Sequence, residues 1–128
     1  MTVWTSDELN KIGTAEELQL ASLRPDSMLR KPVTIWVVRI GDDLYVRSEN
    51  GRTSAWFRGV QERHAGHIRA GGVDKDVSFV DANLEGSDQI DGAYRTKYGH
   101  YEAQYFDPIV SAEAQSATIK LVPRPVSS

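Results

Sequence analysis

The sequence predicts an α+β protein in which short, mostly antiparallel strands form a small barrel and short helices lie between them. Segments rich in Val, Ile and Thr recur between residues 18 and 122, and these residue types favour strands. Three other segments have helical spacing or capping residues. Short strands with helices inserted between them are typical of an α+β barrel and not of a parallel doubly wound sheet.

The length and composition are those of one ordinary globular domain. The chain has 128 residues, of which 40% are hydrophobic and 26% charged, so we expect a single domain over residues 1–122 and a tail at 123–128. It contains no cysteine, which excludes disulfides, thiolate zinc sites and a cysteine nucleophile. The longest wholly apolar stretch is residues 35–38 and no secretory signal is visible, so we expect a cytoplasmic protein with no membrane partner.

The net charge of −3 conceals an uneven distribution of charge along the chain. Residues 24–69 carry nine Lys or Arg and five acids, whereas residues 70–128 carry five and nine. The acidic total argues against a nucleic-acid partner. The basic middle is either a solvated face or a site for an anionic ligand, and charge alone does not distinguish the two.

The first quarter of the chain predicts a helix, a strand and a turn. Thr5 and Glu8 have the spacing of a capping box, so we expect a helix that runs from there to Ile12. The alternation of residues 18–22 predicts a short strand. The segment at 24–27 contains Pro and Asp and is expected to form a turn.

The next segment predicts a β-hairpin that leads into a short helix. Residues 32–40 are rich in Val, Ile and Thr and predict one continuous strand. Residues 41–43 form the expected turn, and residues 44–48 form the return strand. Thr53 or Ser54 then provides a cap for the helix.

In that helix Trp56 and Val60 are four residues apart, and we expect both to face the core. Two more strands are predicted at residues 67–70 and 77–80, and Gly71-Gly72 lies between them. The charged segment 74–76 is interpreted as the turn between them, although its two carboxylates could also serve as paired acids.

The last third of the chain predicts a helix and a final strand. The helix begins at Ser87 and ends at Gly99, and the strand covers residues 118–122. Aromatic residues beyond those that a small core needs could stack on a planar ligand, pack in the core or form an interface. We therefore expect a two-fold symmetric homodimer, the commonest oligomer; the candidate interface residues are Trp36, Tyr101, Tyr105 and Phe106.

The strongest candidate for ligand chemistry is the segment 49–54, which runs from a strand end into a helix start. The N-terminus of a helix offers unpaired N–H groups that bind phosphate or carboxylate. An ordinary capped helix with exposed arginines explains the same residues. With the basic residues that flank the central hairpin, the candidate anion-binding set is Arg30, Lys31, Arg47, Arg52, Thr53 and Ser54.

His64 and His67 invite either a metal site or acid–base chemistry. Two histidines three residues apart share a metal only with the right backbone, and no third ligand has a suitable spacing, so we expect no metal site. A general acid or base needs only a cleft and an orienting partner. The candidate catalytic residues are His64, His67, Tyr45 and Tyr101, with ordinary loop histidines as the alternative.

Segments over nearly the whole chain carry a further signal, namely Trp4-Thr5 with Glu8-Leu9, and residues 32–38, 43–48, 55–57, 68–73, 75–77, 94–99 and 117–123. Together they resemble a family of small bacterial proteins, domain of unknown function 2255. More distantly, the hairpin and the Trp-containing helix are similar to the flavin-binding split barrels, which include pyridoxamine-phosphate oxidases and deazaflavin-dependent nitroreductases. The resemblance implies a small split β-barrel with short helices packed at its ends.

The resemblance also implies a cofactor. In split barrels the coenzyme phosphate lies near basic residues of the central strands, so the six anion-binding candidates would hold FMN or a deazaflavin coenzyme. An oxidoreductase that acts on a planar organic substrate is then expected, although some small split barrels hold no flavin and a fold does not determine a function. Two alternatives stay open: a cofactor-free cyclase or isomerase for a natural-product-like intermediate, and a noncatalytic ligand-binding module.

Overall fold

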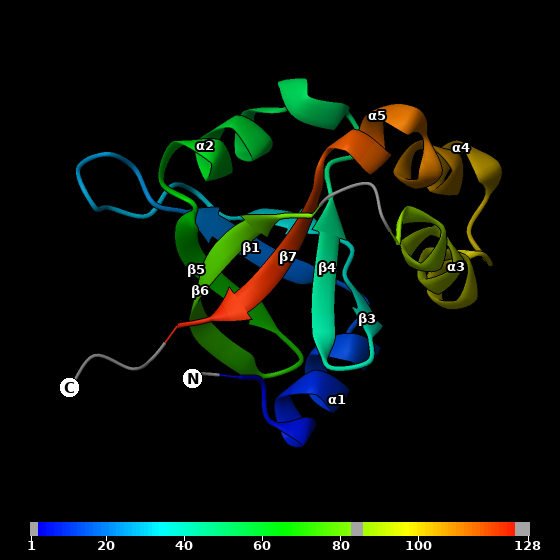
Figure 1. Ribbon diagram of the computed structural model, residues 1–128, viewed down its shortest axis with the longest axis horizontal. Coiled ribbons are helices and arrows are strands. Elements are labelled where there is room, and N and C mark those ends of the chain that lie inside the picture. The colour runs from blue at the N-terminus through cyan, green and yellow to red at the C-terminus, as the bar shows by residue number, and fades with distance from the viewer. Residues whose placement is uncertain (1–2, 83–85, 125–128) are drawn as a thin grey trace.

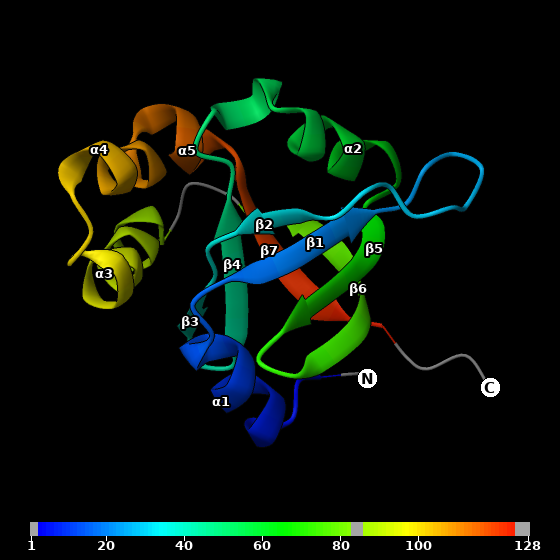
Figure 2. The ribbon, with the colours of Figure 1, turned by 180° about the vertical axis from the view of Figure 1, so that it is seen from behind.

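The computed structural model describes residues 3–82 and 86–124, which form one curled sheet with short helices around it (Figure 1 and Figure 2). The strands are β1 (Leu18–Ser22), β2 (Val33–Ile35), β3 (Val38–Ile40), β4 (Asp43–Arg47), β5 (Ala65–Ala70), β6 (Val73–Asp81) and β7 (Thr118–Pro123). The helices are α1 (Ser6–Thr14), α2 (Ala55–Arg63), α3 (Ser87–Tyr98), α4 (Ala103–Phe106) and α5 (Ala112–Ser116), with two 3₁₀ turns, η1 (Gly51–Thr53) and η2 (Asp107–Val110).

The sheet has the strand order β2-β1-β5-β6-β7-β4-β3, and every neighbouring pair is antiparallel. Its two edge strands, β2 and β3, are consecutive in the chain and only Trp36 and Val37 separate them. Three Cα–Cα steps span at most about 11 Å. The sheet must therefore curl until its edges nearly meet, and the gap between β2 and β3 is the split of the barrel. The predicted α+β split barrel is confirmed.

The prediction of one continuous strand over residues 32–40 is wrong. Val33 pairs with Leu20 of β1, whereas Val38 pairs with Tyr45 of β4. The chain thus leaves one edge of the sheet and joins the other. Strand-forming residues are equally suitable on both sides of the break, so local propensity does not reveal it.

Local capping signals are formed as predicted at the starts of α1 and α2. The Thr5 side chain accepts from the Glu8 backbone N–H at 3.1 Å, and the Glu8 carboxylate accepts from the Thr5 N–H at 2.9 Å. Ser54, one of the two candidate caps, accepts from the Phe57 N–H and begins α2. The third helix starts at Ser87, as predicted.

The β5–β6 hairpin turns at Gly71 and Gly72, which have φ values of 57° and 86°. Positive φ at both central residues is the requirement of a tight hairpin turn. The prediction of a turn at residues 74–76 is wrong, because the glycines already reverse the chain and β6 begins at Val73. Asp74 and Asp76 lie on the outer face of β6.

The barrel encloses the main core, and a smaller core lies outside it against β3 and β4. Figure 1 shows α3, α4 and α5 gathered on one side of β4. No helix is predicted at residues 103–116, because helices of four or five residues are too short to show helical periodicity. None of the helices in the described ranges is both long and apolar enough to span a bilayer. The smaller core contains Val38, Ile90, Tyr94, Tyr98, Phe106 and Ile109.

Candidate ligand-binding cleft

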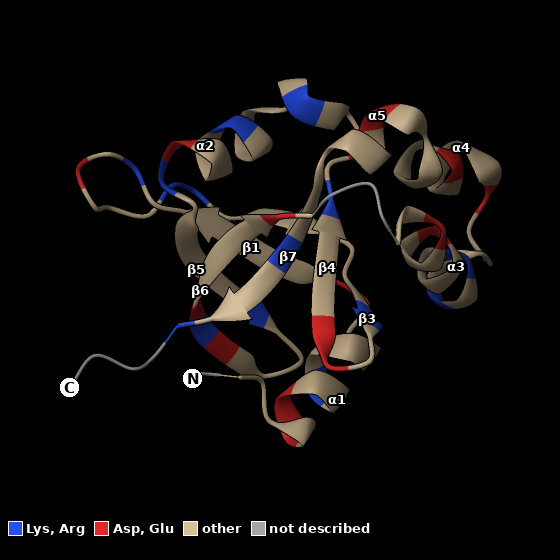
Figure 3. Cartoon of the chain, viewed as in Figure 1, with Lys and Arg blue, Asp and Glu red and all other residues tan. Residues whose placement is uncertain are grey.

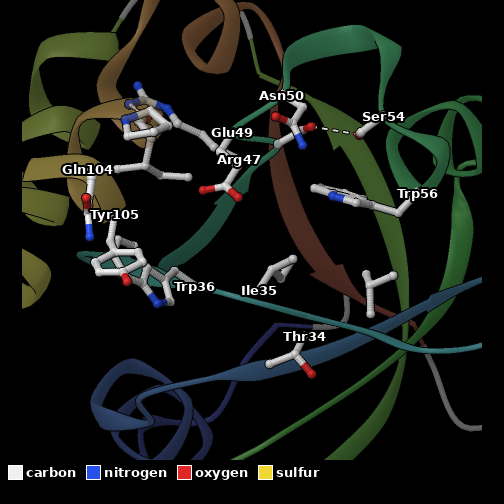
Figure 4. Close-up of a pocket in the computed structure, with 14 residues that line it drawn as sticks. Thr34, Ile35, Trp36, Arg47, Glu49, Asn50, Ser54, Trp56, Gln104 and Tyr105 are labelled. Atoms are coloured by element: carbon white, nitrogen blue, oxygen red, sulfur yellow. Dashed lines mark hydrogen bonds between the residues drawn. The ribbon is translucent and has the colours of Figure 1, made fainter. Parts of the chain in front are cut away.

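A cleft of about 470 Å³ opens between β2, the end of β4, the start of α2 and the α4–η2 segment. Its volume lies in the range of small-molecule sites. Three aromatic side chains border it, and Figure 4 shows Trp56 on one side and Trp36 with Tyr105 on the other. The polar lining residues are Thr34, Arg47, Ser48, Glu49, Asn50, Ser54 and Gln104.

Packing contacts hold two of the aromatic rings in place. The Trp36 ring stacks on Tyr98 with centroids 4.2 Å apart and planes 3° apart. Trp56 lies edge-on to Phe57 with a centroid distance of 6.2 Å. Such contacts limit the freedom of the rings before any ligand arrives.

The prediction that Trp56 faces the core is only partly right. Phe57 and Val60 are buried, whereas the Trp56 side chain is half-buried and packs at the edge of the core. It is the second residue of α2, and this end of the helix adjoins the cleft. The spacing of Trp56 and Val60 identifies the correct helix face but not the position of the opening.

Arg47 is 1% exposed and forms five hydrogen bonds. This number equals the number of N–H groups in a guanidinium. Asp91 forms the ion pair with it, so the charge is matched within the protein. Arg47 thereby fastens α3 and η2 to the barrel. The other acceptors are Thr118 Oγ1 at 3.0 Å, the Ile109 carbonyl at 3.1 Å, and the Ser87 carbonyl and Oγ at 3.2 Å each.

Two further anion-binding candidates, Arg30 and Lys31, do not line this cleft. Arg30 forms an ion pair with Glu62 and lies in a separate depression beside Gly59. A Cβ atom at Gly59 would lie 2.9 Å from Arg30 Nε, so the glycine makes this close approach possible. Lys31 is exposed.

The remaining three candidates lie at η1 and the start of α2. Arg52 donates to the Ser116 carbonyl at 3.0 Å and lies over a neighbouring aromatic ring. Thr53 donates to the Asn50 carbonyl at 3.2 Å. Of these three, only Ser54 lines the cleft, where its hydroxyl is 2.7 Å from that of Ser48. The structure therefore brings only Arg47 and Ser54 of the six candidates together.

The four acid–base candidates lie in separate places, and the described residues that line the cleft include none of them. His64 ends α2 in a left-handed conformation, 3.9 Å from an Asp81 oxygen. Tyr45 packs on the smaller core from β4. Tyr101 donates to Glu16, and this hydrogen bond raises the pKa of Tyr101.

His67 lies on the outer face of β5 between two carboxylates. Its Nδ1 is 2.8 Å from Asp76 Oδ1, and its Nε2 contacts Asp74. Burial lowers the pKa of His67, but the hydrogen bonds and charges of Asp76 and Asp74 outweigh burial, so the pKa is raised. Arg69 also binds Asp74 at 3.0 Å. In the described ranges, no group of three or more His, Asp or Glu side chains is arranged to hold a metal ion.

The sequence placed Glu49 in the candidate ligand segment 49–54 without giving it a role, and it did not indicate Gln104. It named Tyr105 among the aromatics that could stack on a planar ligand, and Trp36 only as a surplus aromatic for a dimer interface. These two residues are 69 positions apart, and they meet because the break after β2 and the short helix α4 lie at the same opening. No local pattern in the sequence links them.

The curled sheet is open between two consecutive edge strands, and a cleft lies beside this opening. This architecture is that of a split barrel. The chain belongs to the bacterial family described as "uncharacterized protein conserved in bacteria (DUF2255)", whose sequence profile matches residues 8–121. The predicted family membership is confirmed. Among curated proteins, no match reaches significance.

Solved structures share the fold at low sequence identity. An F420 reductase is 13% identical, with a TM-score of 0.58 and 93% of each chain covered. A conserved hypothetical protein of Mycobacterium tuberculosis is 13% identical, with a TM-score of 0.63 and coverage of 96% of this chain and 82% of its own. A FAD-binding protein of Mesorhizobium loti is 13% identical, with a TM-score of 0.61 and coverage of 97% and 93%. These likenesses show that the chain shares the fold of these proteins.

The cleft suits the planar ring of a flavin-type group but not its phosphate. Its aromatic walls suit a planar ring system. Arg47 is the only cationic side chain among the described lining residues, and its N–H groups are already bonded to protein acceptors. Glu49 places a carboxylate in the same cleft. The residues therefore fit a planar ring but do not fit a coenzyme phosphate.

Proposed function

We propose that this protein binds a planar organic molecule in the cleft, with its rings between Trp56 on one side and Trp36 and Tyr105 on the other. The observation that carries the proposal is the convergence of three aromatic side chains from distant segments on one opening (Figure 4). Tyr105 is 56% exposed. A planar ligand would cover this apolar surface and stack on the rings.

Binding is supported better than catalysis. The acid–base candidates His64, His67, Tyr45 and Tyr101 lie outside the cleft, so they do not support a cofactor-free cyclase or isomerase there. A flavin- or deazaflavin-dependent oxidoreductase would use the same ring site, and the fold of the F420- and FAD-related proteins supports that finer form of the proposal. It would also need a phosphate site outside the cleft.

Tryptophan fluorescence can test the proposal directly, because two of the three tryptophans line the cleft. We expect titration with riboflavin, a planar tricyclic compound, to quench the fluorescence of the protein in a saturable way. Loss of a stacked ring removes about 0.5–1.5 kcal/mol of binding free energy beyond the buried area. Trp56→Ala should therefore weaken binding about three- to tenfold or more.

The matched control is Val80→Ala, which removes apolar atoms from an exposed side chain on β6 outside the cleft. We expect this variant to bind riboflavin like the wild type. Absence of saturable quenching at millimolar ligand would contradict the proposal. An unchanged affinity in Trp56→Ala would also contradict it. The absorption spectrum of the freshly purified protein tests separately whether a flavin copurifies.

A further inference from the structure

We infer that the cleft selects planar ligands that are neutral or positively charged and disfavours those that carry a phosphate. This inference rests on the proposed function and specifies the class of ligand. It sets this chain apart from what the likeness to flavin- and F420-related structures implies, namely an anionic coenzyme. Three features of the charge distribution carry it.

The first feature is the carboxylate of Glu49. Glu49 lies two residues after the end of β4. Its side chain is exposed and lines the cleft. Figure 4 shows it between Trp56 and the pair formed by Trp36 and Tyr105. Glu49 forms no ion pair with any residue in the described ranges. Its charge therefore faces whatever enters the cleft.

The second feature is the neutralisation of Arg47. The ion pair with Asp91 balances its charge, and its five hydrogen bonds occupy its N–H groups. A phosphate in the cleft would have to break these bonds to reach the guanidinium. Breaking a buried ion pair is strongly destabilising, because it leaves an uncompensated charge inside the protein.

The third feature is the absence of cations from the wall opposite α2. Residues 102–116 contain no Lys or Arg, and in Figure 3 the ribbon of this segment, which includes α4 and α5, carries no blue. The residues of this segment that line the cleft are uncharged, namely Gln104, Tyr105, Pro108 and Ile109. Apart from the neutralised Arg47, the nearest cation in sequence to the lining segment 48–50 is Arg52, on η1. It donates to the Ser116 carbonyl and is not among the lining residues.

These charges act together on an entering ligand. Coulomb interaction between two charges in contact is weak in water and becomes stronger where solvent is excluded. A cleft lined by one sign of charge also concentrates ligands of the opposite sign. A phosphate carries about −1.5 to −2 charges at neutral pH, so Glu49 repels it, and the α4–η2 wall offers no cation to offset this repulsion.

Three tricyclic probes of similar ring size separate charge from shape: proflavine is a cation, riboflavin is neutral, and FMN is riboflavin with a phosphate. We expect affinities in the order proflavine, riboflavin, FMN, with FMN about three- to tenfold weaker than riboflavin at low salt. High salt should narrow the differences, because it screens charges.

Glu49→Gln removes the charge and keeps the size of the side chain. We expect it to weaken proflavine binding about two- to fivefold and to leave the affinity for riboflavin nearly unchanged. The affinity for FMN should rise toward that for riboflavin. The matched control is Glu17→Gln, an exposed glutamate outside the cleft, which should keep the order of the wild type.

The outcomes distinguish this inference from the proposed function. If none of the three probes binds, the planar-ligand function itself is wrong. If FMN binds as tightly as riboflavin or more tightly, the planar site stands and the charge selectivity is overturned, because the phosphate then reaches a cation such as Arg52. If Glu49→Gln leaves the order and spacing of the affinities unchanged, the role of Glu49 is overturned.

Discussion

Arg47 is the last residue of β4, just before the candidate anion-binding segment, yet its environment makes it a structural residue. A buried guanidinium is stable only when its charge and N–H groups are matched. Asp91 supplies the charge, and acceptors from three elements supply the hydrogen bonds. The exposed Glu49, two residues further along the chain, is the charged side chain that remains for a ligand.

His67 illustrates a second charged cluster, on the opposite side of its strand from the core. Its raised pKa means that protonated His67 stabilises the fold at low pH. This contribution is fully present below the unfolded-state pKa of about 6.5 and is lost as the pH rises through the higher folded-state pKa.

We therefore expect the wild type to lose part of its stability between about pH 6 and about pH 9, and His67→Gln to lose less over the same interval. Urea unfolding at both pH values measures the difference. His100→Gln, which changes an exposed histidine after α3, serves as the control and should follow the wild type. A pH dependence in His67→Gln equal to that of the wild type would contradict the assignment.

At the scale of elements, the β5–β6 turn links the barrel to α1. A Cβ atom on Gly71 would lie 2.2 Å from the Lys11 carbonyl oxygen, whereas one on Gly72 would meet nothing within 4 Å. Both residues have positive φ. They therefore share the conformational requirement and differ only in the contact with α1.

Alanine substitutions at Gly71 and Gly72 separate the cost of backbone strain from the cost of a steric clash. We expect Gly72→Ala to lower the free energy of unfolding by about 1–2 kcal/mol, because a side chain disfavours the left-handed region. Gly71→Ala should cost more, since it also forces α1 away from the turn. Chemical denaturation of both variants measures the two values. Equal losses would show that α1 moves away without cost.

At the scale of the whole molecule, the cleft and the exposed Tyr105 lie on the side of the barrel that carries the split. Aromatic side chains are enriched at interfaces between subunits. Cyclic dimers are the commonest assemblies of soluble proteins. A homodimer remains the proposal for this chain, and a second copy would then cover part of the exposed aromatic surface.

Light scattering at micromolar concentration tests the assembly. We expect a particle with twice the 14.3 kDa mass of the chain. The mass should fall toward that of the monomer on dilution if association is weak, because dimer formation depends on concentration. A mass of one chain throughout the micromolar range would contradict the homodimer.

Several elements could be predicted from the sequence because their causes are local. The capping box depends on Thr5 and Glu8, three residues apart, and the short helix depends on Ser54 in the same way. Even where the prediction misplaced the β5–β6 turn, the adjacent pair Gly71 and Gly72 was available as the local signal. Such interactions form between near neighbours in any tertiary context.

Only the tertiary structure decided the break at Trp36 and the composition of the cleft. The break arises because the flanking strands pair with β1 and β4, at opposite edges of a sheet that must curl. The burial of Arg47 depends on Asp91 and Ser87, more than 39 residues away. Sequence by itself determined the helix caps and the strand-forming segments. The cleft depends on strand pairing and burial between segments that are far apart in the chain. These interactions bring together side chains that no local sequence pattern connects.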